Sequence, residues 1–138
     1  MRRLTGGGTS SRHGCGLAGL DYIRSRQDWS HMTEFRHEDL LDSLKEPFVF
    51  CDGNHVIRYM NRAARTRYAG KPASVGRSIF DCHNDTSNER IRAVCARLAA
   101  GEDEVLTWEG DGQRVYTRAV RDADAQFLGY FERFELDA

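Results

Sequence analysis

The sequence FVFCDGNHVIRYMN at Phe48–Asn61 contains two apolar runs, Phe48–Cys51 and His55–Met60, separated by an Asp-Gly-Asn turn. Asp, Gly and Asn accept the positive φ angles that tight hairpin turns require. The runs are rich in Val, Phe, Ile and Tyr, whose side chains suit the half-buried surface of a pleated sheet. The stretch therefore predicts a β-hairpin, and the Asn-Arg-Ala-Ala segment from Asn61 predicts the start of a helix.

The second run also shows the alternation of a strand, in which successive side chains point to opposite faces. We expect one face to carry Ile57, Tyr59 and Asn61, and the other to carry Val56, Arg58 and Met60. The turn itself is expected at Asp52-Gly53-Asn54, so that His55 already belongs to the second strand.

Two helices are expected after the hairpin. The first, Asn61–Ala69, ends at Gly70, a residue suited to a left-handed C-cap. The second, Ser87–Ala100, begins within the sequence Thr-Ser-Asn-Glu, which reads as a capping box. Its apolar side chains follow the i, i+3, i+4, i+7 spacing of one helix face, at Ile91, Val94, Cys95 and Leu98. This stripe is expected to face a sheet.

The last third of the chain has the pattern of strands. Glu104–Glu109 alternates, and Arg114–Arg121 and Gln126–Leu136 follow it around a second turn at Asp122–Ala125. With the first hairpin, these segments predict an α+β fold with a five-stranded antiparallel sheet. Helices are then expected to cover one face of that sheet.

A helix is also expected before the hairpin, at Glu34–Glu46, because Pro47 disfavours its continuation. Its apolar side chains fall near one face, at Phe35, Leu40, Leu41 and Leu44. Two interpretations stay open. The stripe packs into the core of its own chain, or it forms the interface of a two-fold homodimer, extended by Leu20 and Ile23.

Residues 1–33 are expected to be a disordered or partly helical tail, and residues 34–138 the folded domain. The first sixteen residues are rich in Gly, Ser and Thr and cannot bury enough apolar surface to order. Leu17–Met32 is the part that is expected to become helical, if any does. Met32 is an alternative start of the protein, which would make residues 1–31 a mis-assigned extension.

Length and composition fit one soluble domain: 138 residues, 40% hydrophobic and 30% charged. No apolar run approaches the about 18 residues of a membrane span, and no signal peptide is recognisable, so we expect a cytoplasmic protein without membrane contact. The net charge of −1 gives no basis for nucleic-acid binding. The cysteines are not spaced for zinc, and no metal site is expected.

Three motifs together resemble a PAS domain. One is the hairpin followed by Asn-x-Ala-Ala. Another is Ala119–Gly129, AVRDADAQFLG, which is similar to the closing hairpin x-V-R-D-x-D-G-x-x-x-G, with Ala125 where Gly is usual. The third is VGRSIFD at Val75–Asp81, similar to the Gly-Arg-x-Ile-x-Asp element of the family. The resemblance covers about residues 36–136 and implies the PAS strand order 2-1-5-4-3.

The resemblance implies a sensory or signalling module that binds a small molecule or a partner protein and signals through homodimerisation. The sequence contains no G-x-S-x-G, H-E-x-x-H or G-x-x-x-x-G-K motif, so we expect no catalytic activity. The identity of the ligand, and whether a resident cofactor exists, are left open.

A ligand pocket is expected between the sheet and the long helix. The alternation of the strands and the stripe of the helix point to a set of candidate ligand-binding residues: Cys51, Tyr59, Asn61, Cys82, His83, Ile91, Cys95, Tyr116 and Phe131. Tyr59, Tyr116 and Asn61 would supply polar contacts. Each of these residues is also compatible with a purely structural place in the core.

Cys82 and His83 suggest one alternative function, a haem-dependent gas or redox sensor in which His83 ligates the iron. The arrangement Gly-Arg…Cys-His is similar to PAS domains attached to hemerythrin-like proteins, but lacks the prolines that commonly follow the His. Oxygen-sensing haem PAS domains place the proximal His on the long helix, and Ser87–Ala100 contains none. The Asn-Cys-Arg-Phe-Leu-Gln motif of flavin photoreceptors is also missing, since only Cys82 matches it.

Overall fold

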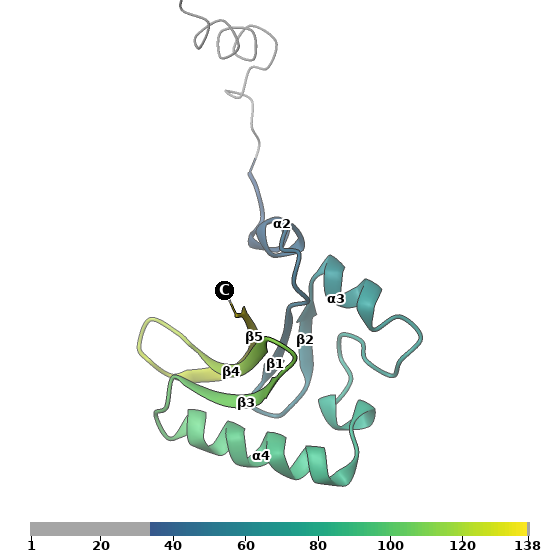
Figure 1. Cartoon of the computed structure of the whole chain (residues 1–138). Coiled ribbons are helices and arrows are strands. Elements are labelled where there is room, and N and C mark those ends of the chain that lie inside the picture. The colour runs from purple at the N-terminus through teal and green to yellow at the C-terminus, as the bar shows by residue number, and fades with distance from the viewer. Residues whose placement is uncertain (1–33, 138) are drawn as a thin grey trace, which may run out of the picture. The chain divides into compact units, whose positions relative to one another are not determined.

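A five-stranded antiparallel sheet forms the centre of the computed structural model, which describes residues 34–137. The strands are β1 Val49–Asp52, β2 Ile57–Met60, β3 Glu104–Gly110, β4 Gln113–Arg121 and β5 Phe127–Leu136. Their order in the sheet, β2-β1-β5-β4-β3, confirms the predicted topology. Figure 1 shows the long helix α4 crossing one face of the sheet. The compact unit begins at Arg36, and the predicted 1–33 tail lies outside the described residues.

The first hairpin forms as predicted, but its turn extends one residue further. His55, which the sequence places in the second strand, adopts a left-handed conformation with φ of 65°. The Asp52 carboxylate holds the turn by accepting hydrogen bonds from the backbone N–H groups of Asn54 and Val56. The positive φ therefore falls on His55, because the Asp52 side chain holds the backbone N–H groups of the two residues that flank it, Asn54 and Val56.

A β-bulge interrupts the alternation of side chains that the sequence predicts for β2. Phe50 pairs with Tyr59 and Cys51 pairs with Ile57, so that Arg58 is the extra residue. An extra residue inverts the alternation on its far side. Ile57 and Met60 are both buried, whereas Tyr59 lies on the opposite face from Met60. Sequence alternation alone predicted Ile57 and Tyr59 on one face, and it was wrong because it assumed an unbroken strand.

The helix before the sheet is shorter than the predicted Glu34–Glu46. Helix α2 spans His37–Asp42, and Ser43 ends it by donating its hydroxyl to the Asp39 carbonyl oxygen. The Asn61 side-chain amide then donates hydrogen bonds to the Leu41 and Glu46 carbonyl oxygens, which holds the backbone after α2 in a non-helical conformation. Tertiary contacts, which the helical pattern does not contain, therefore end α2 before Pro47.

The helices after the hairpin follow the predicted order. Helix α3 spans Arg62–Arg67, the 3₁₀ turn η2 spans Ile79–Cys82, and α4 spans Asp85–Ala99. The N-cap of α4 is Asn84, whose side chain accepts from the Ser87 N–H, so the predicted capping box is replaced by an earlier cap. The predicted stripe is confirmed, since Cys95 and Leu98 are buried in the core and Ile91 and Val94 pack against it.

The closing hairpin keeps its usual geometry despite Ala125. This residue adopts a φ of 61°, the conformation for which Gly is usually selected. The Asp122 carboxylate compensates by accepting hydrogen bonds from the N–H groups of Asp124 and Gln126. Further along, Gly129 allows β5 to approach β1, because an added Cβ would lie 2.0 Å from the Cys51 carbonyl oxygen.

Candidate functional site

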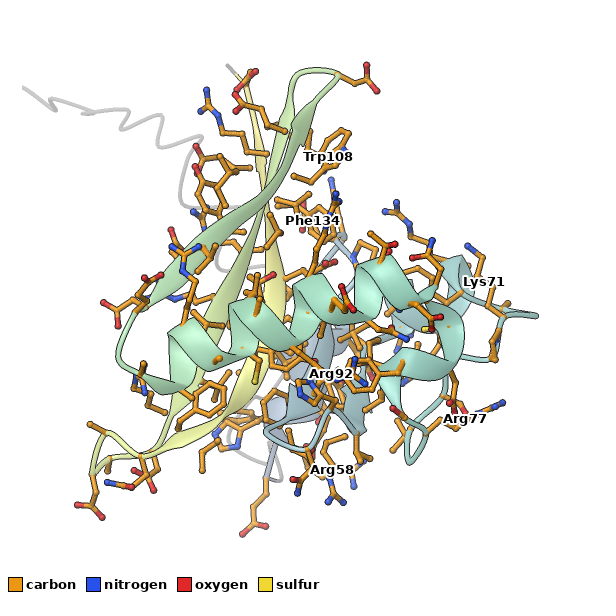
Figure 2. All side chains as sticks on the ribbon, turned by 90° about the horizontal axis from the view of Figure 1, so that it is seen from below. Arg58, Lys71, Arg77, Arg92, Trp108 and Phe134 are labelled. Atoms are coloured by element: carbon orange, nitrogen blue, oxygen red, sulfur yellow. The ribbon has the colours of Figure 1, made fainter. Side chains whose placement is uncertain are left out.

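A cavity of about 480 Å³ lies between the sheet and the helical layer. Its apolar walls come from both layers, with Val49, Ile57, Met60 and Val115 from the sheet and Ile91 and Val94 from α4. Polar groups are fewer and come from both layers, from the loop before η2, the end of η2 and the N-terminal part of α4 on one side, and from strands β3, β4 and β5 on the other. Figure 2 shows Trp108, which also lines the cavity, on the part of the sheet that extends beyond α4.

Five of the nine predicted ligand-binding residues border this cavity: Cys51, Cys82, His83, Ile91 and Phe131. The Phe131 ring also packs against Phe48, with 4.8 Å between centroids. Cys51 is fully enclosed, and burial raises the pKa of its thiol to about 12. The thiol therefore stays protonated at neutral pH and offers a weak hydrogen-bond donor, not a nucleophile.

The other four predicted residues lie elsewhere, which corrects the pocket predicted from sequence. Cys95 is buried in the core beneath the cavity wall. Tyr116 lies on the opposite face of the sheet, where the Arg133 guanidinium stacks on its ring at 4.4 Å. The bulge in β2 turns Tyr59 away from the cavity. The Asn61 side chain is engaged in hydrogen bonds to the backbone. Strict alternation failed for Tyr59 and Tyr116 because it fixes neither the register nor the face.

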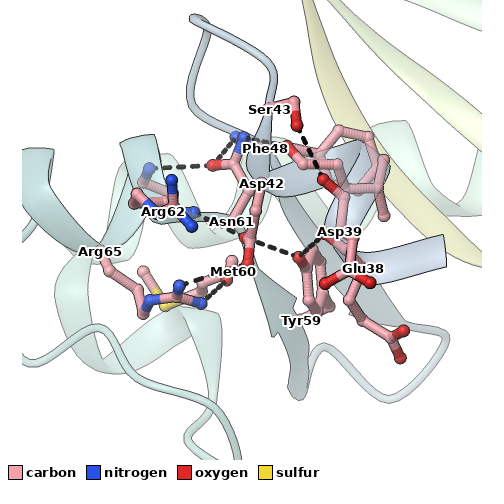
Figure 3. Close-up of polar contacts among 12 residues, drawn as sticks. Glu38, Asp39, Asp42, Ser43, Phe48, Tyr59, Met60, Asn61, Arg62 and Arg65 are labelled. Atoms are coloured by element: carbon pink, nitrogen blue, oxygen red, sulfur yellow. Dashed lines mark hydrogen bonds and ion pairs between the residues drawn. The ribbon is translucent and has the colours of Figure 1, made fainter. Parts of the chain in front are cut away.

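Asn61 and Asp42 join α2, α3 and the sheet (Figure 3). Asn61 Oδ1 accepts from the N–H groups of Phe48 and Ala64 at 2.8 and 2.9 Å, and Nδ2 donates to the Leu41 and Glu46 carbonyl oxygens at 3.0 Å each. Every hydrogen-bonding position of this buried amide is therefore occupied. Asn61 positions the elements around the cavity but has no group left for a ligand.

The Asp42 carboxylate completes this junction by accepting the Tyr59 hydroxyl at 2.8 Å and the Arg62 N–H at 2.9 Å. The Tyr59 hydrogen bond is the main reason that the pKa of Asp42 is lowered. Tyr59, predicted as a polar ligand contact, thus fixes α2 against the outer face of the sheet.

His83 and Cys82 stand together at the edge of the cavity, at the end of η2. The His83 Nδ1 lies 2.9 Å from the Ile79 carbonyl oxygen and 3.3 Å from the Cys82 sulfur. A carbonyl oxygen can only accept, so Nδ1 is the donor in this contact, and in the neutral imidazole the lone pair then lies on Nε2. His83 is exposed, and its free nitrogen is therefore available to a ligand.

Tyr130 lines the cavity and contacts His55 of the first turn. Its hydroxyl shares a hydrogen bond with His55 Nδ1 at 2.9 Å, and His55 packs on Phe80 with 4.6 Å between ring centroids. The Arg92 guanidinium lies over the Phe80 ring, 4.2 Å from the ring centroid. Desolvation and the nearby Arg92 lower the pKa of His55, which keeps the imidazole neutral in this position.

Sequence reasoning missed Tyr130, Thr117 and Glu132, which all line the cavity. Thr117 pairs with Glu132 across β4 and β5, and Tyr130 precedes Glu132 by two residues on the same face. A signal was present, since the predicted strand Gln126–Leu136 alternates, but Phe131 was assigned to the inner face in place of its two neighbours.

The predicted interface residues all lie on or beside α2, which contains no fully buried residue. Phe35, Leu40 and Leu44 have exposed fractions of 59%, 57% and 44%, and Leu41 is half-buried. Within residues 34–137, no group of three or more His, Cys, Asp or Glu side chains is arranged to hold a metal ion. In the same part of the chain, no helix has both the length and the apolar character required to cross a membrane.

Comparison with known proteins agrees with this fold. A family model described as PAS domain matches residues 38–135. The chain therefore belongs to the PAS domain family, whose members are generally sensory modules. No curated protein matches the chain.

Solved structures with low sequence identity share the fold. A C-terminal domain from Streptococcus mutans is 21% identical, with a TM-score of 0.61 over 75% of this chain and 90% of that one. A sensory box sensor histidine kinase from Vibrio cholerae is 14% identical, with a TM-score of 0.52 over 87% and 93%. The PAS domain of Bordetella pertussis BvgS is 16% identical, with a TM-score of 0.50 over 88% and 87%.

Proposed function

We propose that this PAS domain is a cytoplasmic, non-catalytic sensor that binds a small molecule in the cavity between the sheet and α4. The observation that carries the proposal is the cavity itself, about 480 Å³ with mainly apolar walls and a few polar groups. Pockets of this size and lining suit small organic ligands. Contacts from both layers mean that a bound molecule would touch the sheet and α4 together and shift their packing.

The test is to release and identify small molecules that co-purify with the protein, using mass spectrometry. Ile91→Trp places a larger side chain in the cavity and is expected to abolish co-purification, whereas Leu106→Trp, at an exposed position on β3, is the matched control. Bound molecules that survive Ile91→Trp would place the site elsewhere. A wild-type protein that binds neither a small molecule nor a partner protein would exclude the proposed function.

A second candidate, a haem-based gas or redox sensor, is supported by one observation. The Nδ1–H of His83 is directed to the Ile79 carbonyl oxygen, which leaves Nε2 in the form that ligates metals. Haem bound there would supply an iron centre for a diatomic gas or for electron transfer, and the apolar cavity walls would surround its ring. Visible spectra of protein from haem-supplied cells test this candidate. A Soret band that His83→Ala removes supports it, and its absence from the wild type rejects it.

The sensor is proposed to pass on its state by pairing with a second copy through α2. The support is a pair of exposed apolar side chains, Leu40 on α2 and Leu44 just after it, where the helix is fixed to the sheet through Asp42 and Tyr59. Because burial of a Leu side chain contributes about 1.5–3 kcal/mol, two such pairs can sustain a symmetric interface. Leu40→Glu combined with Leu44→Glu tests this interface through the association state of the protein.

A further inference from the structure

The negative charge that lines the cavity belongs to Glu132. On β5 this residue pairs with Thr117 of β4 and lies two positions after the buried Tyr130. Side chains along a strand alternate, so Glu132 points to the same side as Tyr130, whereas Arg133 points to the opposite side. The carboxylate is thus presented to the interior of the cavity from the sheet.

Glu132 differs from the other carboxylates of the sheet because it has no assigned partner. Glu104 and Glu135 both pair with Arg133, at 3.0 and 2.9 Å. Across residues 34–137, no hydrogen bond or ion pair engages the Glu132 side chain. The Glu132 side chain is exposed to solvent, and desolvation by the surrounding protein still raises its pKa. A carboxylate that borders a cavity and has no protein partner is free to accept a hydrogen bond from a ligand.

The positive groups of the cavity come from the other layer. Lys71, His83 and Arg90 belong to the segments that face the sheet, and Figure 2 shows Lys71 on the loop beside one end of α4. His83 and Arg67 attract the Glu132 carboxylate at longer range. The cavity is therefore polarised, with its negative end on the sheet and its positive groups on the helices and loops. A cation inside it is most stable against the sheet.

We propose that the ligand has an apolar or aromatic body and a protonated nitrogen that donates a hydrogen bond to the Glu132 carboxylate. This inference rests on the proposed function of the cavity as a small-molecule site. The body would pack on Val49, Ile57, Ile91 and Val94, which form the apolar walls. Thr117, directly across from Glu132, would accept a second hydrogen bond from the same nitrogen.

Three probes of similar size test the proposal: tryptamine, a cation; tryptophol, its neutral alcohol analogue; and indole-3-acetate, an anion. Their affinities for the full-length protein are measured at pH 7 by titration calorimetry, and the site by backbone amide NMR. We expect tryptamine to bind about tenfold more tightly than tryptophol, as one charge-assisted hydrogen bond predicts, and indole-3-acetate to bind most weakly.

Glu132→Gln keeps the shape of the side chain and removes its charge, so it is expected to abolish the preference for tryptamine over tryptophol. Glu89→Gln makes the same change at an exposed position on α4 outside the cavity and should retain the preference. A measurement on the wild type keeps the test independent of how Glu132→Gln folds. In carboxyl ¹³C NMR, tryptamine should lower the pKa of Glu132, and tryptophol should leave it in place.

The outcomes separate the two proposals. If tryptophol or indole-3-acetate binds in the cavity as tightly as tryptamine, the cavity is a small-molecule site but the role of Glu132 is wrong. If tryptamine binds preferentially and Glu132→Gln does not change the preference, the cationic group is recognised elsewhere and the proposal fails. If no probe binds and nothing co-purifies with the protein, both this inference and the small-molecule function are rejected.

Discussion

The Asn61 side chain makes four hydrogen bonds to the backbone of three different segments. Its amide ends α2, caps α3 and holds the backbone that enters β1, all through hydrogen bonds that are shielded from water. Since each buried group loses its partner when the amide is removed, the cost of substitution should exceed that of an ordinary helix cap.

The first prediction is that Asn61→Ala lowers the free energy of unfolding by about 3 kcal/mol, because four backbone groups, one buried and three partly buried, lose their partner. The control is Asn84→Ala, which removes one cap hydrogen bond from α4 and should cost about 1 kcal/mol. Urea unfolding followed by circular dichroism measures both. Equal costs would show that water replaces the lost hydrogen bonds around Asn61.

Gly129 lies where β5 approaches the backbone of β1. An added Cβ would meet the Cys51 carbonyl oxygen at 2.0 Å, so Gly129→Ala must separate β5 from β1 and should cost about 2–4 kcal/mol. Gly70→Ala is the matched control, because Gly70 has a positive φ of 79° but no atom within 4 Å of the added Cβ. It should cost about 1 kcal/mol, the conformational term alone. A similar loss in both variants would mean that close approach is unimportant at Gly129.

At the scale of elements, α2 is the segment whose role differs most from that of a core helix. It has no fully buried residue, and it is anchored by the polar side chains Asp42 and Tyr59 more than by its leucines. An element attached in this way can keep its own position while its apolar side chains contact another molecule.

We predict that Leu40→Glu combined with Leu44→Glu gives a folded monomer, because two charges on each copy would be buried in the proposed interface. Light scattering across a concentration series measures the association state. Leu128→Glu with Leu136→Glu, at exposed positions on β5, is the control and should leave association unchanged. Dimers that persist in the α2 variant would place the interface elsewhere. Unfolding of that variant would assign the leucines to the core of the chain.

At the scale of the whole molecule, carboxylates act on stability in opposite directions. The Tyr59 hydrogen bond lowers the pKa of Asp42, so that its contribution is present above the unfolded pKa and is lost as pH falls. Desolvation raises the pKa of Glu132 above its ordinary 4.5. Between the ordinary pKa and the raised pKa, the folded state binds a proton at Glu132 more tightly than the unfolded state does. Rising pH through this interval therefore removes stability.

The prediction is that Glu132→Gln becomes more stable relative to the wild type as pH rises from the ordinary Glu value of 4.5 towards neutrality, and that the two converge at the lower pH. Urea midpoints at several pH values measure the difference, with Glu89→Gln as a control that should show no such trend. Because His83, Lys71, Arg67 and Arg90 face the same region, the series is repeated in a His83→Gln background. A constant difference across pH would contradict an unpaired Glu132.

Local patterns were sufficient to predict much of this fold. The turn residues around Gly53 and Asp122, the strand composition and the apolar stripe Ile91–Leu98 specify five strands and a long helix in the order that the structure shows. Each of these signals depends on neighbours within a few residues, because turn geometry and helical periodicity are set by the local backbone. The PAS topology followed from motifs at both ends of the domain.

Only the tertiary structure decided which residues line the cavity. One bulged residue, Arg58, reverses the face of Tyr59, and the pairing of β4 with β5 brings Thr117 and Glu132 together across 15 positions of sequence. Similarly, α2 ends where Asn61, distant in sequence, donates hydrogen bonds to the Leu41 and Glu46 carbonyl oxygens. Strand register and long-range hydrogen bonds are not encoded in the period of any single segment, because they depend on which partner lies opposite.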